Sequence, residues 1–270
     1  MTLPLVIEAS ELHLQLDNPD LLIIDLSSEE NYLKGHIPGA IHLPASRLLR
    51  GKPPIPNKLP DLEQLQQLCR DIGLNSRSQV VVYDDQLGPW AGRLIWTLNI
   101  LGHEQCSFLN GQLLAWTQAG FELETSSNKP VQSDITISIQ KDLVADVAFI
   151  NDQSSSADTA IWDARSPEEY SGEKVINAQK GGHIPGAINF EWTECLLSTD
   201  NPKLKPASEL QTLLAEKGLT HEKSIITHCQ THRRSGLTYL VAKHLGFNNV
   251  RCYDGSWFEW GNLADTPVEK

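Results

Sequence analysis

The sequence has little of the material from which disulfide frameworks, metal centres and membrane spans are built. Its five cysteines are scattered and odd in number, which disfavours a disulfide framework or a zinc site and fits a reducing compartment. No apolar run approaches the roughly 18 residues that a membrane-spanning helix needs. The opening MTLPLVIEAS has no basic stretch followed by a long apolar one, so we expect no secretory signal. We expect a cytoplasmic protein without a metal or a cofactor.

Positive charge is also scarce. Lysine and arginine number 22 against 34 aspartate and glutamate residues, and the formal net charge is −12. This balance argues against a protein that binds nucleic acid or an acidic membrane surface. Apolar residues make up 40% of the 270 positions, which is enough for one large or two medium-sized globular cores.

The chain contains an internal repeat. The hexapeptide GHIPGA occurs at Gly35–Ala40 and again at Gly182–Ala187, an offset of 147 residues. Further on, Val80–Gly102 aligns without a gap with Ser224–Gly246 at an offset of 144 residues. Self-similarity over blocks of this length is typical of duplication, so the sequence predicts two related domains of roughly 120 residues each. Two fused copies also favour a monomer.

The domain limits follow from composition. The polar segment 125–133 lacks apolar periodicity, so we predict a linker there between an N-terminal domain, 1–124, and a C-terminal domain, 134–270. The offsets within the repeat give the second copy nine extra residues around Lys174–Gly181, which we interpret as a surface loop. A polar stretch that begins at Asn151 is predicted to be another loop.

Short apolar runs alternate with helical patterns in both repeats. This alternation indicates an α/β fold in which each domain is a parallel sheet flanked by helices on both faces. Ligand sites in such sheets form beyond the carboxyl ends of the strands. The predicted buried strands are Leu21–Leu26, Val80–Tyr83, Ala160–Ala164 and Ser224–Thr227, and the clearest helical patterns are Asp61–Ile72 and Ala207–Lys217.

The loop HCQTHRRSG, His228–Gly236, carries the candidate chemistry. It follows a predicted strand and precedes a helical run, Leu237–Leu245, so its backbone N–H groups can converge at a helix N-terminus that is partly positive. Arg233 and Arg234 add full charge. Such surroundings lower a thiol pKa below its free value of about 8.5 and favour the reactive thiolate. We therefore predict that Cys229 is a nucleophile beside an anion-binding loop.

The first repeat supplies an internal comparison. Asp85 occupies the position of Cys229, while Pro89 and Trp90 stand where the second copy has its two arginines. We expect this copy to keep the fold without the chemistry and to act as a structural or substrate-walling partner.

The residues resemble a known family. YLKGHIPGAIHL (Tyr32–Leu43) and VRCYDGSWFEW (Val250–Trp260) resemble the two signature regions of tandem-domain rhodaneses, and CQTHRRSG is similar to the loop of bacterial thiosulfate sulfurtransferases. The resemblance spans nearly the whole chain. It implies two rhodanese-like domains and a ping-pong cycle, in which thiosulfate gives its outer sulfur to the cysteine and leaves as sulfite. A thiophilic acceptor (cyanide, a thiol or a thioredoxin-like protein) then removes the sulfur.

The resemblance also implies roles for individual residues. Cys229 becomes the persulfide residue, the amides of Gln230–Ser235 its cradle, and Arg234 the ligand of the substrate anion. Arg165 matches an arginine associated with substrate binding, and Trp192 is a candidate wall. The expected substrate-binding residues are Gln230, Thr231, His232, Arg233, Arg234, Arg165 and Trp192.

Alternatives differ in substrate or class. 3-Mercaptopyruvate is the alternative sulfur donor, although two adjacent arginines favour the compact dianion thiosulfate. A cysteine phosphatase would have five residues between cysteine and arginine, whereas four separate Cys229 from Arg234. A non-enzymatic sulfur-carrier or regulatory rhodanese module is the third alternative.

The histidines of the repeated hexapeptide are a separate case. His36 and His183 recur in both repeats, so we interpret them as structural residues that bond loop backbone.

Overall fold

The computed structural model describes residues 2–154 and 156–270, which form two compact units. Unit 1 comprises the chain up to Arg50, Leu59–Gln140 and Leu197–Leu204, and unit 2 comprises Gly51–Lys58, Lys141–Leu196 and Lys205–Lys270. Residues 125–140 contain no helix or strand. Because both units are discontinuous in sequence, the limits placed at residues 124 and 134 stay a prediction.

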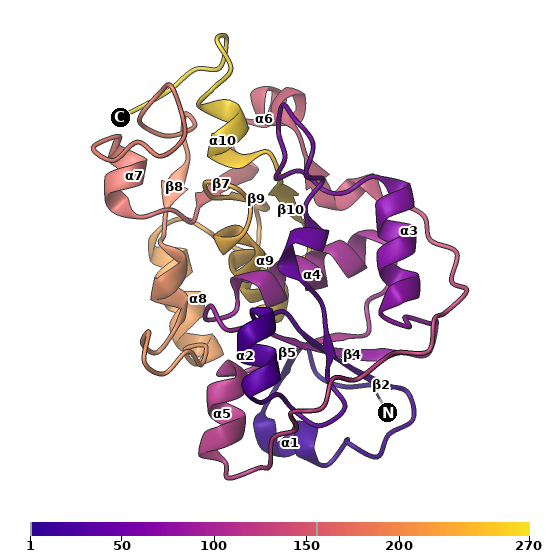
Figure 1. Cartoon of the computed structure of the whole chain (residues 1–270). Helices are drawn as coiled ribbons and strands as arrows, with labels where there is room; N and C mark the ends of the chain where they lie inside the picture. The colour runs from indigo at the N-terminus through magenta and orange to yellow at the C-terminus, as the bar shows by residue number, and fades with distance from the viewer. Residues whose placement is uncertain (1, 155) are drawn as a thin grey trace. The chain divides into compact units, whose positions relative to one another are not determined.

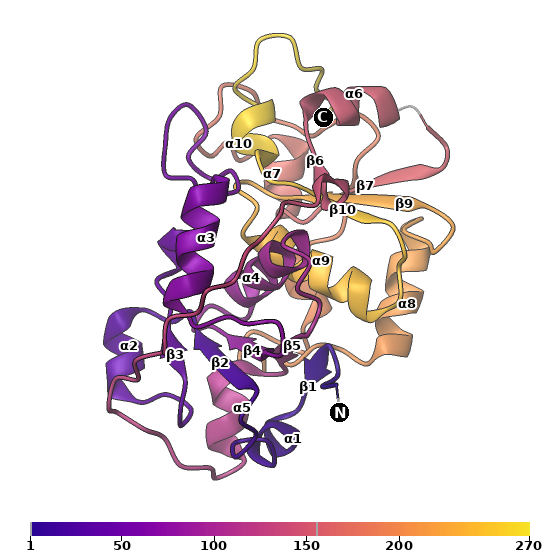
Figure 2. The ribbon, with the colours of Figure 1, turned by 90° about the vertical axis from the view of Figure 1, so that its right-hand side faces the viewer.

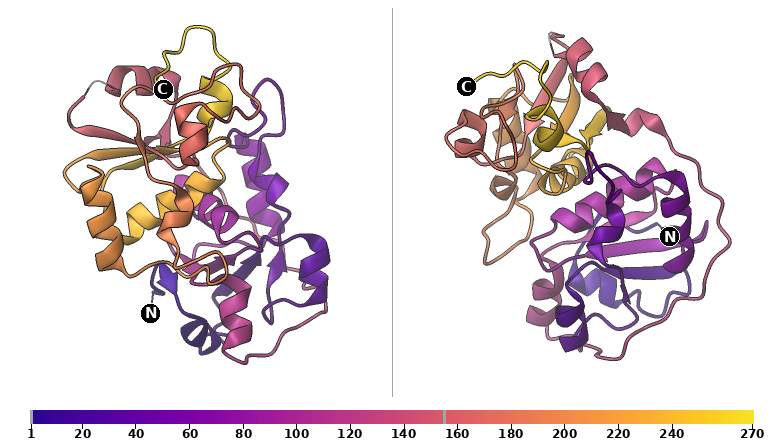
Figure 3. Two further views of the ribbon diagram at one scale, coloured as in Figure 1. Left: turned by 90° about the vertical axis from the view of Figure 1, so that its left-hand side faces the viewer. Right: turned by 45° about the horizontal axis from the view of Figure 1, so that its top comes forward.

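Unit 1 is a parallel five-stranded sheet in the order β1-β5-β4-β2-β3, of which Figure 1 labels β2, β4 and β5. Helices α3 and α4 lie on one face of the sheet, and α1 and α5 lie on the other (Figures 2 and 3). The strands are β1 (Val6–Ile7), β2 (Leu21–Asp25), β3 (Ile41–His42), β4 (Gln79–Tyr83) and β5 (Cys106–Leu109). The helices are α1 (Ala9–His13), α2 (Glu29–Lys34), α3 (Leu62–Asp71), α4 (Pro89–Ile100) and α5 (Gln112–Gln118), with the 3-10 helix η1 (Ala45–Leu48).

Unit 2 repeats this architecture, with the corresponding strand order β6-β10-β9-β7-β8, again all parallel. Helices α8 and α9 lie on one face of its sheet, and α6, α7 and α10 on the other (Figure 2). Its strands are β6 (Val144–Ala145), β7 (Thr159–Asp163), β8 (Ile188–Asn189), β9 (Ser224–His228) and β10 (Val250–Tyr253). Its helices are α6 (Val147–Gln153), α7 (Pro167–Ser171), α8 (Ala207–Glu216), α9 (Arg234–His244) and α10 (Ser256–Trp260), with the 3-10 helices η2 (Lys141–Leu143) and η3 (Trp192–Cys195).

The sheets carry the cores. Val80 and Val81 in β4 and Ile225 in β9 are at most 1% exposed, because helices cover both faces of each parallel sheet. Trp257 and Trp260 of α10 belong to the core cluster of unit 2. In the described part of the chain, no helix has the length and apolar character to span a membrane.

The predicted strands and the helices predicted at Asp61–Ile72 and Ala207–Lys217 are confirmed to within about one residue. The duplicated parallel-sheet fold is also confirmed. One loop prediction was wrong in detail. Asn151 begins no loop, because Val147–Gln153 forms α6 with Asp146 as its N-cap; Ser155, within the same stretch, lies outside the described residues. The extra residues 174–181 do form a surface loop without helix or strand.

Candidate active site

The predicted cysteine lies at the carboxyl end of the central strand β9. The strand includes His228 and α9 begins at Arg234, so the connecting segment is residues 229–233, here called the cysteine loop. The sequence prediction placed the start of the helix at Leu237, three residues too late, because Ser and Gly are weak helix formers that disguise its first turn. His232 reverses the chain with a φ of 53° and its Nδ1 lies 2.7 Å from the Ser235 Oγ.

The Cys229 thiol is buried within this loop, with 1% of the residue exposed. Burial raises its pKa, but the charge of Arg234, the Ser235 hydroxyl and the N–H groups of Ser235 and Thr231 outweigh burial and lower the pKa. Elsewhere in the chain burial acts without such donors, and it raises the pKa of Cys69 to about 12. The loop therefore favours a thiolate at Cys229 despite its burial.

Arg234 is held beside the thiol by an ion pair. Its Nη1 and Nη2 donate to the two carboxylate oxygens of Glu169 at 2.6 and 2.9 Å. Glu169 lies on α7, where it also completes the capping box with Ser166. Burial raises the pKa of Glu169, but its hydrogen bonds to Arg234 and the charge of that residue lower it overall. The bidentate geometry fixes the plane of the guanidinium group next to the sulfur.

Arg165 has a different environment from the one predicted. Its Nε and Nη2 bond the Asp163 carboxylate at 2.6–3.0 Å, Nη2 also donates to the Gly182 carbonyl at 2.8 Å, and its Cζ lies 4.4 Å from the Trp257 ring. Arg165 is 1% exposed. These contacts favour a role in the frame of the site, and the contact with substrate stays a prediction.

His228 completes this buried group. Its Nε2 lies 3.7 Å from the Asp163 Oδ2, and burial lowers the pKa of His228, which favours the neutral ring. Within the described residues no group of three or more His, Cys, Asp and Glu is arranged to hold a metal.

Helix α10 holds the backbone of the cysteine loop. The N–H groups of Trp257 and Phe258 donate to the carbonyls of Cys229 and Gln230 at 3.0 and 2.9 Å. The Cys229 N–H in turn donates to the Ser256 Oγ at 3.4 Å. The sequence showed the aromatic residues of α10 but not these bonds, since backbone donors leave no signal in composition.

The remaining predicted residues fall in different surroundings. Thr231 is half-buried, with its N–H directed at the sulfur, while Arg233 is exposed at the N-cap of α9. Gln230 is buried and its Nε2 donates to the Ile176 carbonyl at 2.5 Å. Trp192 is half-buried at the start of η3, where its N–H donates to the Ala164 carbonyl.

The two GHIPGA histidines are structural, as predicted. The Nδ1 of His36 lies 2.7 Å from the Tyr32 carbonyl, and that of His183 lies 3.0 Å from the Tyr170 carbonyl. Each imidazole stacks on the ring of the same tyrosine, with centroids 3.7 and 3.6 Å apart. Both repeats thus use the same device to shape the turn.

In the first repeat the corresponding loop is filled by its own carboxylate. Asp84, which is 1% exposed, accepts hydrogen bonds at 2.7–2.9 Å from four amides of the loop and of the start of α4. Asp85, aligned with Cys229, instead accepts from Ser28 and Asn31. Sequence reasoning found the aligned residue but missed the role of Asp84. The donors belong to Gln86, Gly88, Trp90 and Ala91.

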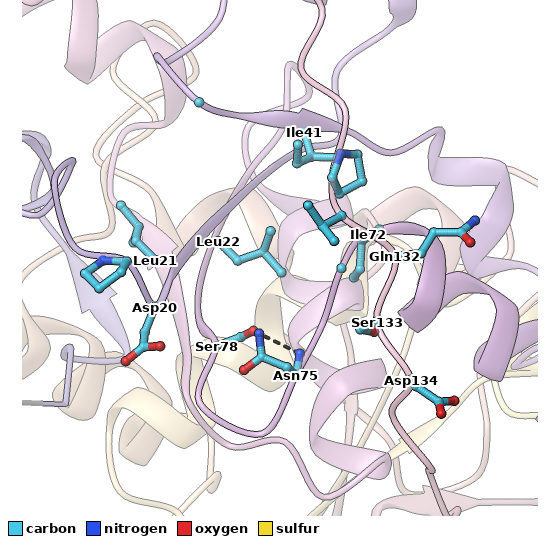
Figure 4. Close-up of a pocket in the computed structure, with 15 residues that line it drawn as sticks. Asp20, Leu21, Leu22, Ile41, Ile72, Asn75, Ser78, Gln132, Ser133 and Asp134 are labelled. Carbon is cyan, nitrogen blue, oxygen red and sulfur yellow. Dashed lines mark hydrogen bonds between the residues drawn. The ribbon is translucent and has the colours of Figure 1, made fainter.

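Unit 1 contains a cavity of about 510 Å³ (Figure 4). It is lined by Leu21 and Leu22 at the start of β2, which is the opposite end of the strand from Asp25. Its charged lining residues are Asp20 and Asp134, which would repel an anion. We assign this cavity no part in sulfur chemistry.

The fold and the site together define a class: duplicated α/β proteins with an activated cysteine at the carboxyl end of the central strand of one copy. The model of the rhodanese-like domain matches residues 8–119 and 147–263. The chain therefore belongs to the rhodanese-like family.

Several similar proteins cover nearly the whole chain. The thiosulfate sulfurtransferase of Azotobacter vinelandii is 46% identical over 268 residues, covering 99% of this chain and 98% of the relative. The 3-mercaptopyruvate sulfurtransferase of Escherichia coli K12 is 31% identical and covers 94% of each. The crystal structure of SseA from Escherichia coli, described as a 3-mercaptopyruvate sulfotransferase of rhodanese fold, matches with a TM-score of 0.84 at 29% identity, over 94% of this chain and 99% of that one.

Proposed function

We propose that this chain is a thiosulfate sulfurtransferase that carries sulfur as a persulfide on Cys229. The observation that carries the proposal is the enclosure of this thiol by the Thr231 and Ser235 N–H groups and the Arg234 guanidinium. These groups stabilise a negative charge on sulfur, which both the thiolate and the persulfide require. The 46% identity with a full-length thiosulfate sulfurtransferase supports the same reaction.

The first half-reaction loads the enzyme. The Cys229 thiolate attacks the outer sulfur of thiosulfate, the sulfur–sulfur bond of the donor breaks, and sulfite leaves with the electron pair. The product is a cysteine persulfide whose terminal sulfur is anionic. Arg234 faces the departing charge while its other edge is anchored by Glu169, so its position costs no reorganisation during the step.

The second half-reaction unloads it. A thiophilic acceptor attacks the terminal sulfur of the persulfide, and the Cys229 thiolate is released as the leaving group. With cyanide the product is thiocyanate, and with a thiol it is a new persulfide. Cyanide, thiols and a thioredoxin-like protein remain the proposed acceptors. The chain then returns to its starting state without a cofactor.

The donor is thiosulfate in this proposal, with 3-mercaptopyruvate as the alternative. The adjacent cations Arg233 and Arg234 suit a small dianion better than a ketoacid with one carboxylate. Two relatives named for thiosulfate are also 45–46% identical to the chain, compared with 31% for one named for 3-mercaptopyruvate. We further propose a cytoplasmic location, because all five cysteines are free and buried. We propose a monomer, because the chain already contains two fused copies of the domain.

Steady-state kinetics test the proposal. The purified full-length chain is assayed for thiocyanate and sulfite with thiosulfate and cyanide, and separately for pyruvate with 3-mercaptopyruvate. We expect a higher kcat/KM for thiosulfate and no turnover after Cys229→Ser. A higher kcat/KM for 3-mercaptopyruvate overturns the donor, and full activity of Cys229→Ser overturns the mechanism. Release of phosphate from a phosphate ester, lost on Cys229→Ser, would establish a phosphatase instead.

A further inference from the structure

The surface loop 174–181, here called the insertion because the first repeat lacks it, bonds directly to the cysteine loop. The Gln230 Nε2 donates to the Ile176 carbonyl at 2.5 Å. The Trp257 Nε1 donates to the Lys180 carbonyl at 3.2 Å, while the Trp257 N–H donates to the Cys229 carbonyl. Two backbone carbonyls of the insertion therefore hold the two residues next to Cys229. Gln230 follows Cys229 in the chain, and Trp257 is hydrogen-bonded to its carbonyl.

The insertion is itself anchored to the C-terminal segment. The Lys180 Nζ donates to the carbonyls of Ala264 and Thr266 at 3.0 and 2.7 Å and to the Thr266 Oγ1 at 3.0 Å. The backbone N–H of Lys180 also donates to the Gly261 carbonyl at 3.0 Å. A loop fastened at this many points can serve as a fixed support, although much of it is exposed.

The first repeat shows what a loop without this insertion looks like. Gln86, which aligns with Gln230, is exposed, whereas Gln230 is 7% exposed. The first-repeat loop is organised by the Asp84 carboxylate at its centre. The second repeat has no carboxylate at the corresponding position, His228, and its centre must stay open for sulfur. An external support therefore replaces an internal one.

We propose that the insertion 174–181 is a clamp that positions the cysteine loop, with Gln230 and Trp257 as its two attachment points. Gln230 is then a positioning residue, and its carboxamide is directed at the insertion. The clamp keeps the Thr231 and Ser235 N–H groups aimed at the sulfur while Cys229 alternates between thiolate and persulfide. The inference rests on the proposed function, since it concerns the same sulfur.

The effect on catalysis follows from geometry. Hydrogen bonds to an anion weaken steeply as the donors turn away from it. The Thr231 and Ser235 N–H groups therefore stabilise the Cys229 thiolate only while the loop keeps them pointed at the sulfur. Loss of one attachment should therefore lower the reactivity of Cys229 at neutral pH. The substrate itself still meets Arg234, whose ion pair with Glu169 contains no residue of the insertion.

Two full-length variants test the clamp. Gln230→Met keeps side-chain length without the donor, and Trp257→Phe keeps a ring beneath Arg165 without the Nε1 donor. The matched control is Gln86→Met in the first repeat. For each protein, the rate at which iodoacetamide alkylates Cys229 is followed against pH by mass spectrometry, alongside kcat and KM for thiosulfate and cyanide.

We expect either variant to raise the midpoint pH of alkylation by about one and to lower kcat about tenfold at neutral pH, with KM for thiosulfate changed less than twofold. The double variant should lose less than the product of the single effects, since both bonds end on one insertion. Gln86→Met should match the parent chain.

Two results would overturn the clamp. Parental midpoints and kcat values for both variants overturn the clamp, and so does a loss confined to KM, which would make Gln230 a substrate ligand. If Gln230→Met does not fold, Trp257→Phe decides the question alone. If the parent chain takes up no sulfur at Cys229, the proposed function fails instead, and the alkylation profile still reports on the clamp.

Discussion

Glu169 and Arg234 form a two-pronged ion pair across 65 residues of sequence, with the Arg234 Nη1 and Nη2 at 2.6 and 2.9 Å from the two carboxylate oxygens. The pair joins α7 to the first turn of α9, where Arg234 also lowers the pKa of the Cys229 thiol. The arginine is therefore already oriented before any substrate arrives. This preorganisation underlies the predictions that concern the site.

Arg234→Ala should cost about 2–4 kcal/mol of transition-state stabilisation, mostly in kcat/KM for thiosulfate. The guanidinium is proposed to face the departing sulfite, so its loss weakens the transition state more than the fold. Arg234→Lys keeps the charge without the bidentate geometry and should recover only part of the loss. Steady-state rates of sulfite release measure both. An unchanged kcat/KM in Arg234→Ala removes Arg234 from the site.

The lowered pKa of Cys229 predicts a pH-dependent contribution to stability. Because the folded pKa lies below the ordinary thiol value of about 8.5, ionised Cys229 stabilises the fold fully above that value. The contribution is lost as pH falls through the lowered pKa. The free energy of unfolding of the parent chain, minus that of Cys229→Ser, should rise with pH in that window. A difference that stays constant from mildly acidic to mildly alkaline pH contradicts the thiolate.

Asp84 should matter for stability but not for sulfur transfer. Its carboxylate accepts four N–H bonds in the first repeat, so Asp84→Ala leaves buried donors unpaired and should cost about 3 kcal/mol of unfolding free energy. Asp85→Asn is the control, since Asp85 is exposed and should change stability by under about 1 kcal/mol. Denaturant unfolding with sulfur loading measures both quantities. Equal stabilities for the two variants refute the role of Asp84.

Arg165 should act through the frame of the site. It is buried against Asp163 and Trp257, so Arg165→Met breaks a buried ion pair and should lower the unfolding free energy by about 3–5 kcal/mol. The KM for thiosulfate, measured on the protein that remains folded, should stay within about twofold. Parental stability combined with a large rise in KM would instead support the contact with substrate implied by the family resemblance.

Much of the fold could be predicted from the sequence because it rests on patterns that short segments carry. Buried parallel strands are continuous apolar runs, and the repeat of GHIPGA shows the duplication directly. The cysteine loop could be predicted because Cys229 directly follows a predicted strand and two arginines lie in the same short loop. The start of α9 was not, since Arg234 and Ser235 are polar residues whose helical state depends on the site they build.

The support of the loop could not be predicted for two physical reasons. The pairing of Glu169 with Arg234 depends on how α7 and α9 are brought together by the sheet, which no local pattern encodes. The bonds from Gln230 and Trp257 end on carbonyls of the insertion, and every residue has a carbonyl. Asp84 lies beside the aligned Asp85, and only the structure shows which of them fills the loop.

The central claim is that Cys229 holds a sulfur atom as an anion, and the mass of its peptide tests this most directly. The full-length chain is treated with thiosulfate, digested without reductant and analysed by mass spectrometry. We predict one added sulfur, about 32 Da, on the peptide with Cys229, and its loss on addition of cyanide. An unchanged mass at Cys229, or the added sulfur on Cys69, Cys106, Cys195 or Cys252, contradicts the account.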